Sequence, residues 1–194
     1  MTLLLAALLA ALAIFLWEFV AHMFTPLGEA GLSYMPKPSA VSSSMESAIG
    51  DKAGMYMFPT GGLTAKSSRE EQHKAMERVM EEMKTKPSGM LIYKPAGTQF
   101  NFGKTLAVQF VTDLVKALLL IALLSQTVLA SFGQRVGFVV LAGILGAIVT
   151  NIPYWNWYGF TGSYTASQTV MEIIGFFCAG LVIAWLYKPA GAAV

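Results

Sequence analysis

The chain contains four long apolar segments, each suited to cross a bilayer as a helix. They run from Thr2 to Met23, from Thr105 to Phe132, from Val136 to Ile152 and from Gln168 to Tyr187. A hydrocarbon core about 30 Å thick takes about 20 helical residues to cross. The third segment is the shortest, and we expect Pro153 to end it because proline lacks the amide that a helix interior needs. The segments predict an all-α membrane protein with four transmembrane helices.

The composition agrees with a membrane protein. Of 194 residues, 55% are hydrophobic and only 12% are charged, whereas a soluble domain has about 25% charged residues. The formal net charge is +2 without a basic run, so we expect the lipid bilayer and not nucleic acid as a partner.

The first segment predicts a retained membrane anchor, residues 1–23, because no basic residue precedes it and it is longer than a signal-peptide core. Charges in the short connections predict the orientation. Arg135 follows the second segment and Lys188 follows the fourth, while residues 151–167 carry no charge. Basic residues favour the cytoplasmic side, so we expect both termini in the cytoplasm and residues 24–103 outside it.

Residues 24–103 predict a small extracytoplasmic α+β insert, with eight acidic and nine basic residues. The pattern favours helices over 39–49 and 68–84 and strands over 54–59 and 90–93. Ser68 and Glu71 have the spacing of a capping box at the start of the second helix. The remainder, residues 104–194, holds the last three helices and an aromatic outer loop over 151–167.

Several ionisable residues lie inside the apolar segments, at similar predicted depths. Charged side chains facing lipid are costly, so we expect these to face the bundle interior. The cluster could serve as a proton path, a small-ligand site or a carboxylate–histidine metal site. It could equally be a structural network in which the lysine pairs with a carboxylate. The predicted buried polar cluster consists of Glu18, His22, Gln109, Asp113, Lys116 and Glu172.

The insert carries eight of the eleven methionines, and the second predicted insert helix has an apolar face of Met76, Val79, Met80 and Met83. Methionine commonly fills an irregular core, which is the simpler interpretation. Thioethers with an imidazole also suit Cu(I), so a copper site is the alternative. That site would consist of His73, Met76, Met80 and Met83. We expect no cofactor, because haem, zinc and di-iron ligand spacings are missing from the sequence.

Aromatic residues gather before the fourth apolar segment. Tryptophan and tyrosine favour the headgroup region, so an interfacial belt is the first interpretation and a platform for a lipid, a quinone or a partner subunit is the second. These residues are Tyr154, Trp155, Trp157, Tyr158, Phe160 and Tyr164.

Small residues recur at four-residue spacing in the third and fourth segments, which favours close helix packing within the bundle or against another protein. The pairs are Gly133 with Gly137, Gly143 with Ala147, Gly175 with Ala179 and Gly180 with Ala184.

The chain resembles a widespread group of bacterial inner-membrane proteins with one helix, a small insert and three further helices. The resemblance rests on the motifs Gly54-Met-Tyr-Met-Phe-Pro59, Arg135-Val-Gly-Phe138 and Trp155-Asn-Trp-Tyr-Gly-Phe160, followed by Tyr164-Thr165. It implies a multi-pass protein of the bacterial inner membrane with a periplasmic insert. The group has no established activity, so the resemblance implies no functional residue.

Three functions remain as hypotheses. The first is a non-catalytic accessory or structural subunit of a larger membrane complex of respiratory or photosynthetic type, with other membrane proteins as partners. The second is a protein that binds or transports a small ligand, an ion or a proton through the polar cluster. The third is copper handling by the insert. Catalytic motifs are missing from the sequence, which favours a non-catalytic protein over an enzyme.

Overall fold

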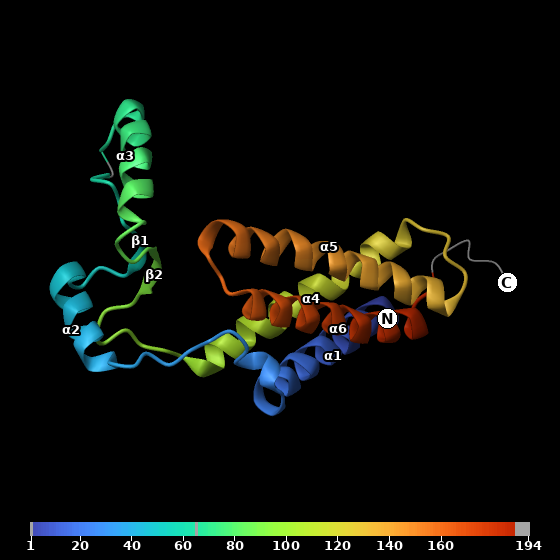
Figure 1. Ribbon diagram of the computed structural model, residues 1–194. Helices are drawn as coiled ribbons and strands as arrows, with labels where there is room; N and C mark the ends of the chain where they lie inside the picture. The colour runs from blue at the N-terminus through green and yellow to red at the C-terminus, as the bar shows by residue number, and fades with distance from the viewer. Residues whose placement is uncertain (1, 65, 189–194) are drawn as a thin grey trace. The chain divides into compact units, whose positions relative to one another are not determined.

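The computed structural model describes residues 2–64 and 66–188, and these fold as two compact units (Figure 1). The first unit takes in the described residues up to Ser33 and from Asn101 onward. The second runs from Tyr34 to Phe100.

The first unit contains four long helices: α1 (Thr2–Phe24), α4 (Phe102–Ser125), α5 (Phe132–Tyr158) and α6 (Gly162–Leu186). All four are long and apolar enough to cross a membrane. Large apolar side chains point outward along them, as lipid-facing residues would. This confirms the four predicted apolar helices and indicates a multi-pass membrane protein.

Within this unit α1 packs between α4 and α6, and α6 also packs along α5. By contrast, α4 and α5 meet only weakly. Alanines on α1, including Ala7 and Ala10, are fully buried, and this lets the neighbouring backbones approach closely. The core beside them includes Leu124 of α4, Val139 of α5 and Ile183 of α6. Three pairs of neighbouring helices are therefore closely packed: α1 with α4, α1 with α6, and α5 with α6.

Most of the small-residue pairs are used inside the bundle. A Cβ atom on Gly143 would overlap the Phe176 side chain, and one on Gly180 would lie 3.3 Å from Val139. Gly133 and Gly137 differ, because nothing lies within 4 Å of a Cβ added at either. Most of these small residues thus serve internal packing.

Several predicted helix boundaries are wrong. The α5 helix continues through Pro153 to Tyr158, although the proline was expected to end it. Proline removes only one internal hydrogen bond, and apolar segments in a membrane favour continued helix, which satisfies the remaining backbone groups. Residues 151–167 therefore contain the end of α5 and the start of α6 in place of one long loop. Phe132 begins α5 and does not belong to the helix before it.

The segment after α1 folds back onto the start of α6. A short 3₁₀ helix, η1 (Pro26–Gly28), is capped by Thr25. The hydroxyl of Ser167 donates to the Leu27 carbonyl oxygen, and the hydroxyl of Thr161 donates to that of Gly31 at 3.2 Å. These contacts close one end of the unit, at which α1 ends and α4 begins. We call it the insert end.

Arg135 organises the opposite end. Its side chain is only 3% exposed and donates to the carbonyl oxygens of Leu129 and Ala130 and, at 2.9 Å, to that of Ala184. A cation near the C-terminus of α6 also interacts favourably with the helix dipole. Arg135 therefore joins the α4–α5 connection to the end of α6.

The second unit contains α2 (Pro38–Ile49), β1 (Gly54–Phe58), α3 (Arg69–Glu82) and β2 (Gly89–Tyr93). The strands pair antiparallel, from Gly54 opposite Tyr93 to Phe58 opposite Gly89. The predicted capping box is confirmed, since Ser68 N–H donates to Glu71 Oε2 at 2.6 Å and Glu71 N–H donates to Ser68 Oγ at 3.3 Å. The predicted order of helices and strands is also confirmed.

The predicted apolar face of α3 is not a core. Met76, Met80 and Met83 are 60%, 55% and 51% exposed, and Val79 is half-buried. Ala75 is the buried residue of this helix, and Gly61 lies against its backbone. The interpretation that these methionines fill a core is therefore wrong. The loop around Gly61 packs on the side of α3 that carries Ala75 and leaves the methionines exposed.

Candidate polar site

The predicted polar cluster is distributed over three helices of the first unit. Glu18 and His22 lie on α1, Gln109, Asp113 and Lys116 on α4, and Glu172 on α6. Glu18, His22, Gln109 and Glu172 lie in the halves of their helices nearer the insert end, whereas Asp113 lies at the middle of α4 and Lys116 one turn beyond it. At about 1.5 Å per residue, Glu18 lies about 9 Å from the end of α1 and Glu172 about 15 Å from the start of α6.

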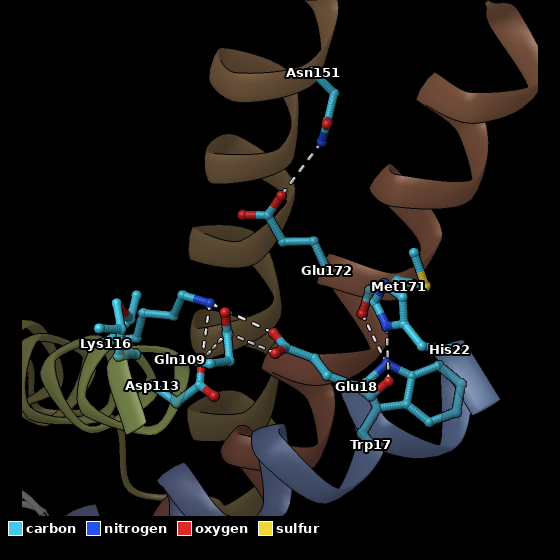
Figure 2. A network of polar contacts seen from close by, with 11 residues as sticks. Trp17, Glu18, His22, Gln109, Asp113, Lys116, Asn151, Met171 and Glu172 are labelled. Carbon is cyan, nitrogen blue, oxygen red and sulfur yellow. Dashed lines mark hydrogen bonds and ion pairs between the residues drawn. The ribbon is translucent and has the colours of Figure 1, made fainter. Parts of the chain in front are cut away.

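Four of these residues form one connected network between α1 and α4 (Figure 2). The Gln109 amide donates to Glu18 at 2.6 Å and to Asp113 at 3.2 Å. Lys116 Nζ donates to Asp113 Oδ1 at 3.0 Å and lies 3.6 Å from Glu18 Oε1. Lys116 thus pairs with two carboxylates, those of Asp113 and Glu18. The i, i+4 and i+7 spacing on α4 places all three of its polar side chains toward α1.

Asp113 is the most enclosed member of the network. It is 0% exposed, and both of its donors reach Oδ1. Its Oδ2 atom is buried without a hydrogen-bond partner among the described residues. A buried carboxylate depends strongly on the donors that it has, so Asp113 is the residue most tightly tied to Lys116.

Glu172 lies apart from this network, on the α5–α6 side (Figure 2). Its hydrogen-bond partner among the described residues is the Asn151 side-chain amide, which donates to Oε2 over a long 3.4 Å. In the described part of the chain no lysine, arginine or histidine lies within ion-pair distance of Glu172. Asn151 was not among the predicted site residues, although a polar residue within an apolar segment was the available signal.

A cavity of about 460 Å³ separates the two groups. It lies where α4 and α5 meet weakly, and side chains from all four helices of the first unit line it. The carboxylates, the ammonium and the amides give it charged and neutral hydrogen-bonding groups. The lining residues are Glu18, His22, Gln109, Lys116, Thr150, Asn151, Gln168, Met171 and Glu172.

His22 lines the cavity without joining a carboxylate. Its Nδ1 lies 2.8 Å from the Glu18 carbonyl oxygen, one helical turn earlier. Among residues 2–64 and 66–188, no three His, Cys, Asp or Glu side chains are grouped to hold a metal ion. A metal centre at the cluster would therefore need ligands beyond these described residues.

The predicted aromatic residues form a stacked row. Tyr154 stacks on Phe160 with ring centroids 5.2 Å apart, and Phe160 meets Tyr164 edge-to-face at 5.4 Å. Tyr158 lies beside Tyr154, with centroids 5.8 Å apart. Trp155 and Trp157 point outward and are 50% and 77% exposed. Exposed tryptophans at the end of an apolar helix suit the headgroup region, so the belt and platform interpretations both stay predictions.

The predicted copper ligands all lie on or next to α3. His73 and Met76 line a cavity of about 520 Å³ together with Arg69 and Gln72. Met80 and Met83 lie outside the lining of this cavity. A guanidinium beside the two nearest candidate ligands does not favour a cation there, and copper binding stays a prediction.

No protein-family model, curated protein or solved structure matches the chain. The resemblance to a group of bacterial membrane proteins therefore stays a prediction.

Proposed function

We propose that the protein binds a small polar ligand in the cavity between Glu172 and the Glu18–Gln109–Asp113–Lys116 network. The observation that carries this proposal is the isolation of Glu172. It is an acidic side chain within an apolar helix, it lines a cavity, and its hydrogen-bond partner is a distant amide. Ionisable residues in such positions commonly mark ligand or ion pathways.

If the polar residues served only to hold the helices together, this would explain the cavity wall formed by α1 and α4 but not the wall that carries Glu172. Glu18, Asp113 and Lys116 neutralise one another and hold α1 to α4. A network serving helix association alone would also be expected to include Glu172. Two opposite charges about 4 Å apart attract by roughly 4 kcal/mol at an effective dielectric constant of about 20. Among the described residues Glu172 has no cation that close, and Lys116 attracts it only at longer range.

The size of the cavity supports a small molecule. Ligand sites usually occupy about 300–1,000 Å³ and combine apolar walls with a few polar groups. The 460 Å³ cavity falls in this range and combines Met171 with carboxylates and amides.

The ligand reaches the site from the non-cytoplasmic side in this proposal, as expected for a binding or transport protein of a bacterial inner membrane. Arg135 lies at the end of the unit opposite the insert end, and Lys188 follows α6 there. The positive-inside rule assigns that end to the cytoplasm. The insert end and the cavity would then face the periplasm.

Cysteine labelling tests the proposal. In a Cys178→Ser background, Thr150→Cys places a thiol in the cavity wall, and Val149→Cys places one on the neighbouring position, which is 64% exposed along an apolar helix face. We expect a water-soluble thiol reagent to modify Thr150→Cys at least tenfold faster. We also expect the dialysable fraction of a source-cell extract to protect it. Equal rates for the two variants together with no protection would contradict a water-filled binding cavity.

A second function, the accessory subunit, is favoured by the exposed methionines of the second unit. Met76 and Met80 on α3 and Met55 and Met57 on β1 are all more than half exposed, and flexible methionine surfaces often contact partners. We propose that Met76→Glu with Met80→Glu removes membrane proteins that co-purify in a mild detergent. Glu77→Gln, on the same helix, serves as the control. Purification of the wild type as a single chain would contradict this function.

A further inference from the structure

We infer that the ligand of this cavity is a small organic monocation, such as a protonated amine, and that Glu172 binds its charged group. This inference rests on the proposed binding function and adds the chemical class of the ligand. Three features of the cavity lead to it: its charge balance, the arrangement of its second wall and its size.

The charge balance favours a cation. Two carboxylates, those of Glu18 and Glu172, line the cavity with a single ammonium group, that of Lys116, and with the His22 imidazole. A third carboxylate, that of Asp113, lies buried behind Lys116. Lys116 lies within 3.6 Å of one of these carboxylates and 3.0 Å of a second. After this pairing the neighbourhood still has an excess of negative charge, and an incoming cation removes it.

The position of Lys116 disfavours an anion or a zwitterion. A ligand carboxylate would have to approach Lys116, which is already flanked by Glu18 and Asp113. Like charges at such distances repel strongly in a site of low dielectric constant. Lys116 thus pairs at short distance with the carboxylates of the first wall. It acts on Glu172 only at longer range, so the Glu172 carboxylate has no close cation among the described residues and is left for the ligand.

The second wall suits one ammonium group. Around Glu172 the cavity is lined by Asn151 and Gln168, whose amide oxygens accept hydrogen bonds and whose amide nitrogens donate them. Gly146 leaves room at the other oxygen, since a Cβ atom there would lie only 3.2 Å from Glu172 Oε1. One carboxylate flanked by neutral amides matches a singly charged donor.

An inorganic metal ion fits less well. Divalent ions take several oxygen ligands at short distances, and the described residues hold no grouping of three acidic, histidine or cysteine side chains. A bare ion would also fill a small part of a 460 Å³ cavity. An organic cation occupies that space with its uncharged part.

A matched set of solutes tests the inference on the full-length protein in lipid nanodiscs. The reporter is the modification rate of Thr150→Cys in the Cys178→Ser background. The solutes are ethanolamine, glycine, glycolate and ethylene glycol, which share a two-carbon frame and differ in charge. We expect ethanolamine to protect the thiol at concentrations at least tenfold lower than the other three.

Variants then identify the group that binds the cation. Glu172→Gln should weaken ethanolamine protection at least tenfold, whereas Glu77→Gln removes the same charge from exposed α3 and should leave protection unchanged. Gln168→Glu adds a second carboxylate beside Glu172 and should strengthen ethanolamine protection several-fold. Misfolding would weaken protection, so it cannot explain a gain in this variant.

The outcomes separate the two proposals. Equal or better protection by glycine, glycolate or ethylene glycol would overturn the monocation inference and leave ligand binding standing. Ethanolamine protection that Glu172→Gln does not change would overturn the role of Glu172. The absence of protection by all four solutes and by the dialysable cell fraction would overturn both the inference and the binding function.

Discussion

Asp113 and Glu172 are both acidic residues of apolar helices, yet their surroundings differ. Asp113 is fully buried, with Lys116 and Gln109 as donors. Glu172 lines the cavity and has one distant amide partner. A substitution at Asp113 should therefore change chiefly stability, and one at Glu172 should change chiefly binding.

Asp113→Asn is expected to destabilise the four-helix unit by about 1–3 kcal/mol, because Lys116 loses its shortest ion pair inside the bundle. The midpoint of denaturant unfolding in detergent micelles measures this change. Lys116→Gln combined with Asp113→Asn should cost less than the sum of the two single changes, because residues in contact are not additive. Strict additivity would show that the 3.0 Å contact contributes little.

Gly31→Ala should loosen the insert end. Gly31 has a φ of +78°, and an added Cβ would overlap the Thr161 hydroxyl and the backbone of Tyr164. The left-handed backbone alone costs a residue with a side chain about 1–2 kcal/mol, and the overlap adds to this. Gly159→Ala is the control, since Gly159 has a φ of +74° and open space around it. Equal losses of stability in the two variants would show that the packing against α6 contributes nothing.

At the scale of single elements, the start of α3 is stabilised by contacts between two residues that are close together in the sequence, Ser68 and Glu71. The Ser68 backbone N–H and then its side chain lower the pKa of the Glu71 carboxyl below its usual 4.5 by hydrogen bonding. A carboxyl whose pKa is depressed by folding stabilises the helix above its unfolded pKa, and this contribution disappears as the pH falls through the folded pKa.

The helix start should therefore weaken in acid. We expect NMR to show that the Glu71 carboxyl titrates at a lower pH in the folded full-length protein than in the same chain unfolded by denaturant. The Ser68→Ala variant should raise the Glu71 midpoint only part of the way, because alanine removes the hydroxyl and keeps the backbone N–H that is the larger cause. A Glu71 midpoint in the folded protein at or above that of the unfolded chain would contradict the capping box as an electrostatic contact.

Elements defined by local pattern could be predicted from the sequence, and elements that depend on packing could not. The four apolar segments and the capping box of α3 required only hydropathy and residue spacing. The extension of α5 past Pro153 depends on the surroundings of the helix. The exposure of Met76 and Met80 depends on which chain segments cover α3, and periodicity carries no information about that.

The same division applies to the candidate site. The depth of each ionisable residue along its helix followed from counting residues, and this placed Glu18, Asp113 and Glu172 at similar levels. Which of these side chains pair with one another depends on which helices are neighbours in the bundle. Because α1 packs between α4 and α6, Lys116 reaches Glu18 in addition to Asp113, and Glu172 faces Asn151.

At the scale of the whole molecule, the orientation in the membrane is the prediction with the widest consequences. In a Cys178→Ser background, Ser42→Cys lies in exposed α2 and Ala130→Cys in the exposed connection between α4 and α5. We expect an impermeant thiol reagent to modify Ser42→Cys in cells with an opened outer membrane. Modification of Ala130→Cys should require disruption of the inner membrane. The reverse pattern would place the cavity on the cytoplasmic side.

The position of α1 between α4 and α6 also has a consequence for biosynthesis. Glu18 lies on the first helix to be synthesised, but its donors lie on α4, which is made after the whole insert. The indole of Trp17 donates to the Met171 carbonyl oxygen at 2.8 Å, and Met171 belongs to the last of the four helices. If the four helices enter a membrane in chain order, α1 lacks this acceptor until the end of synthesis. A chain that stopped after α5 would leave the Trp17 indole N–H in the apolar part of α1 without the acceptor that it has in the complete bundle.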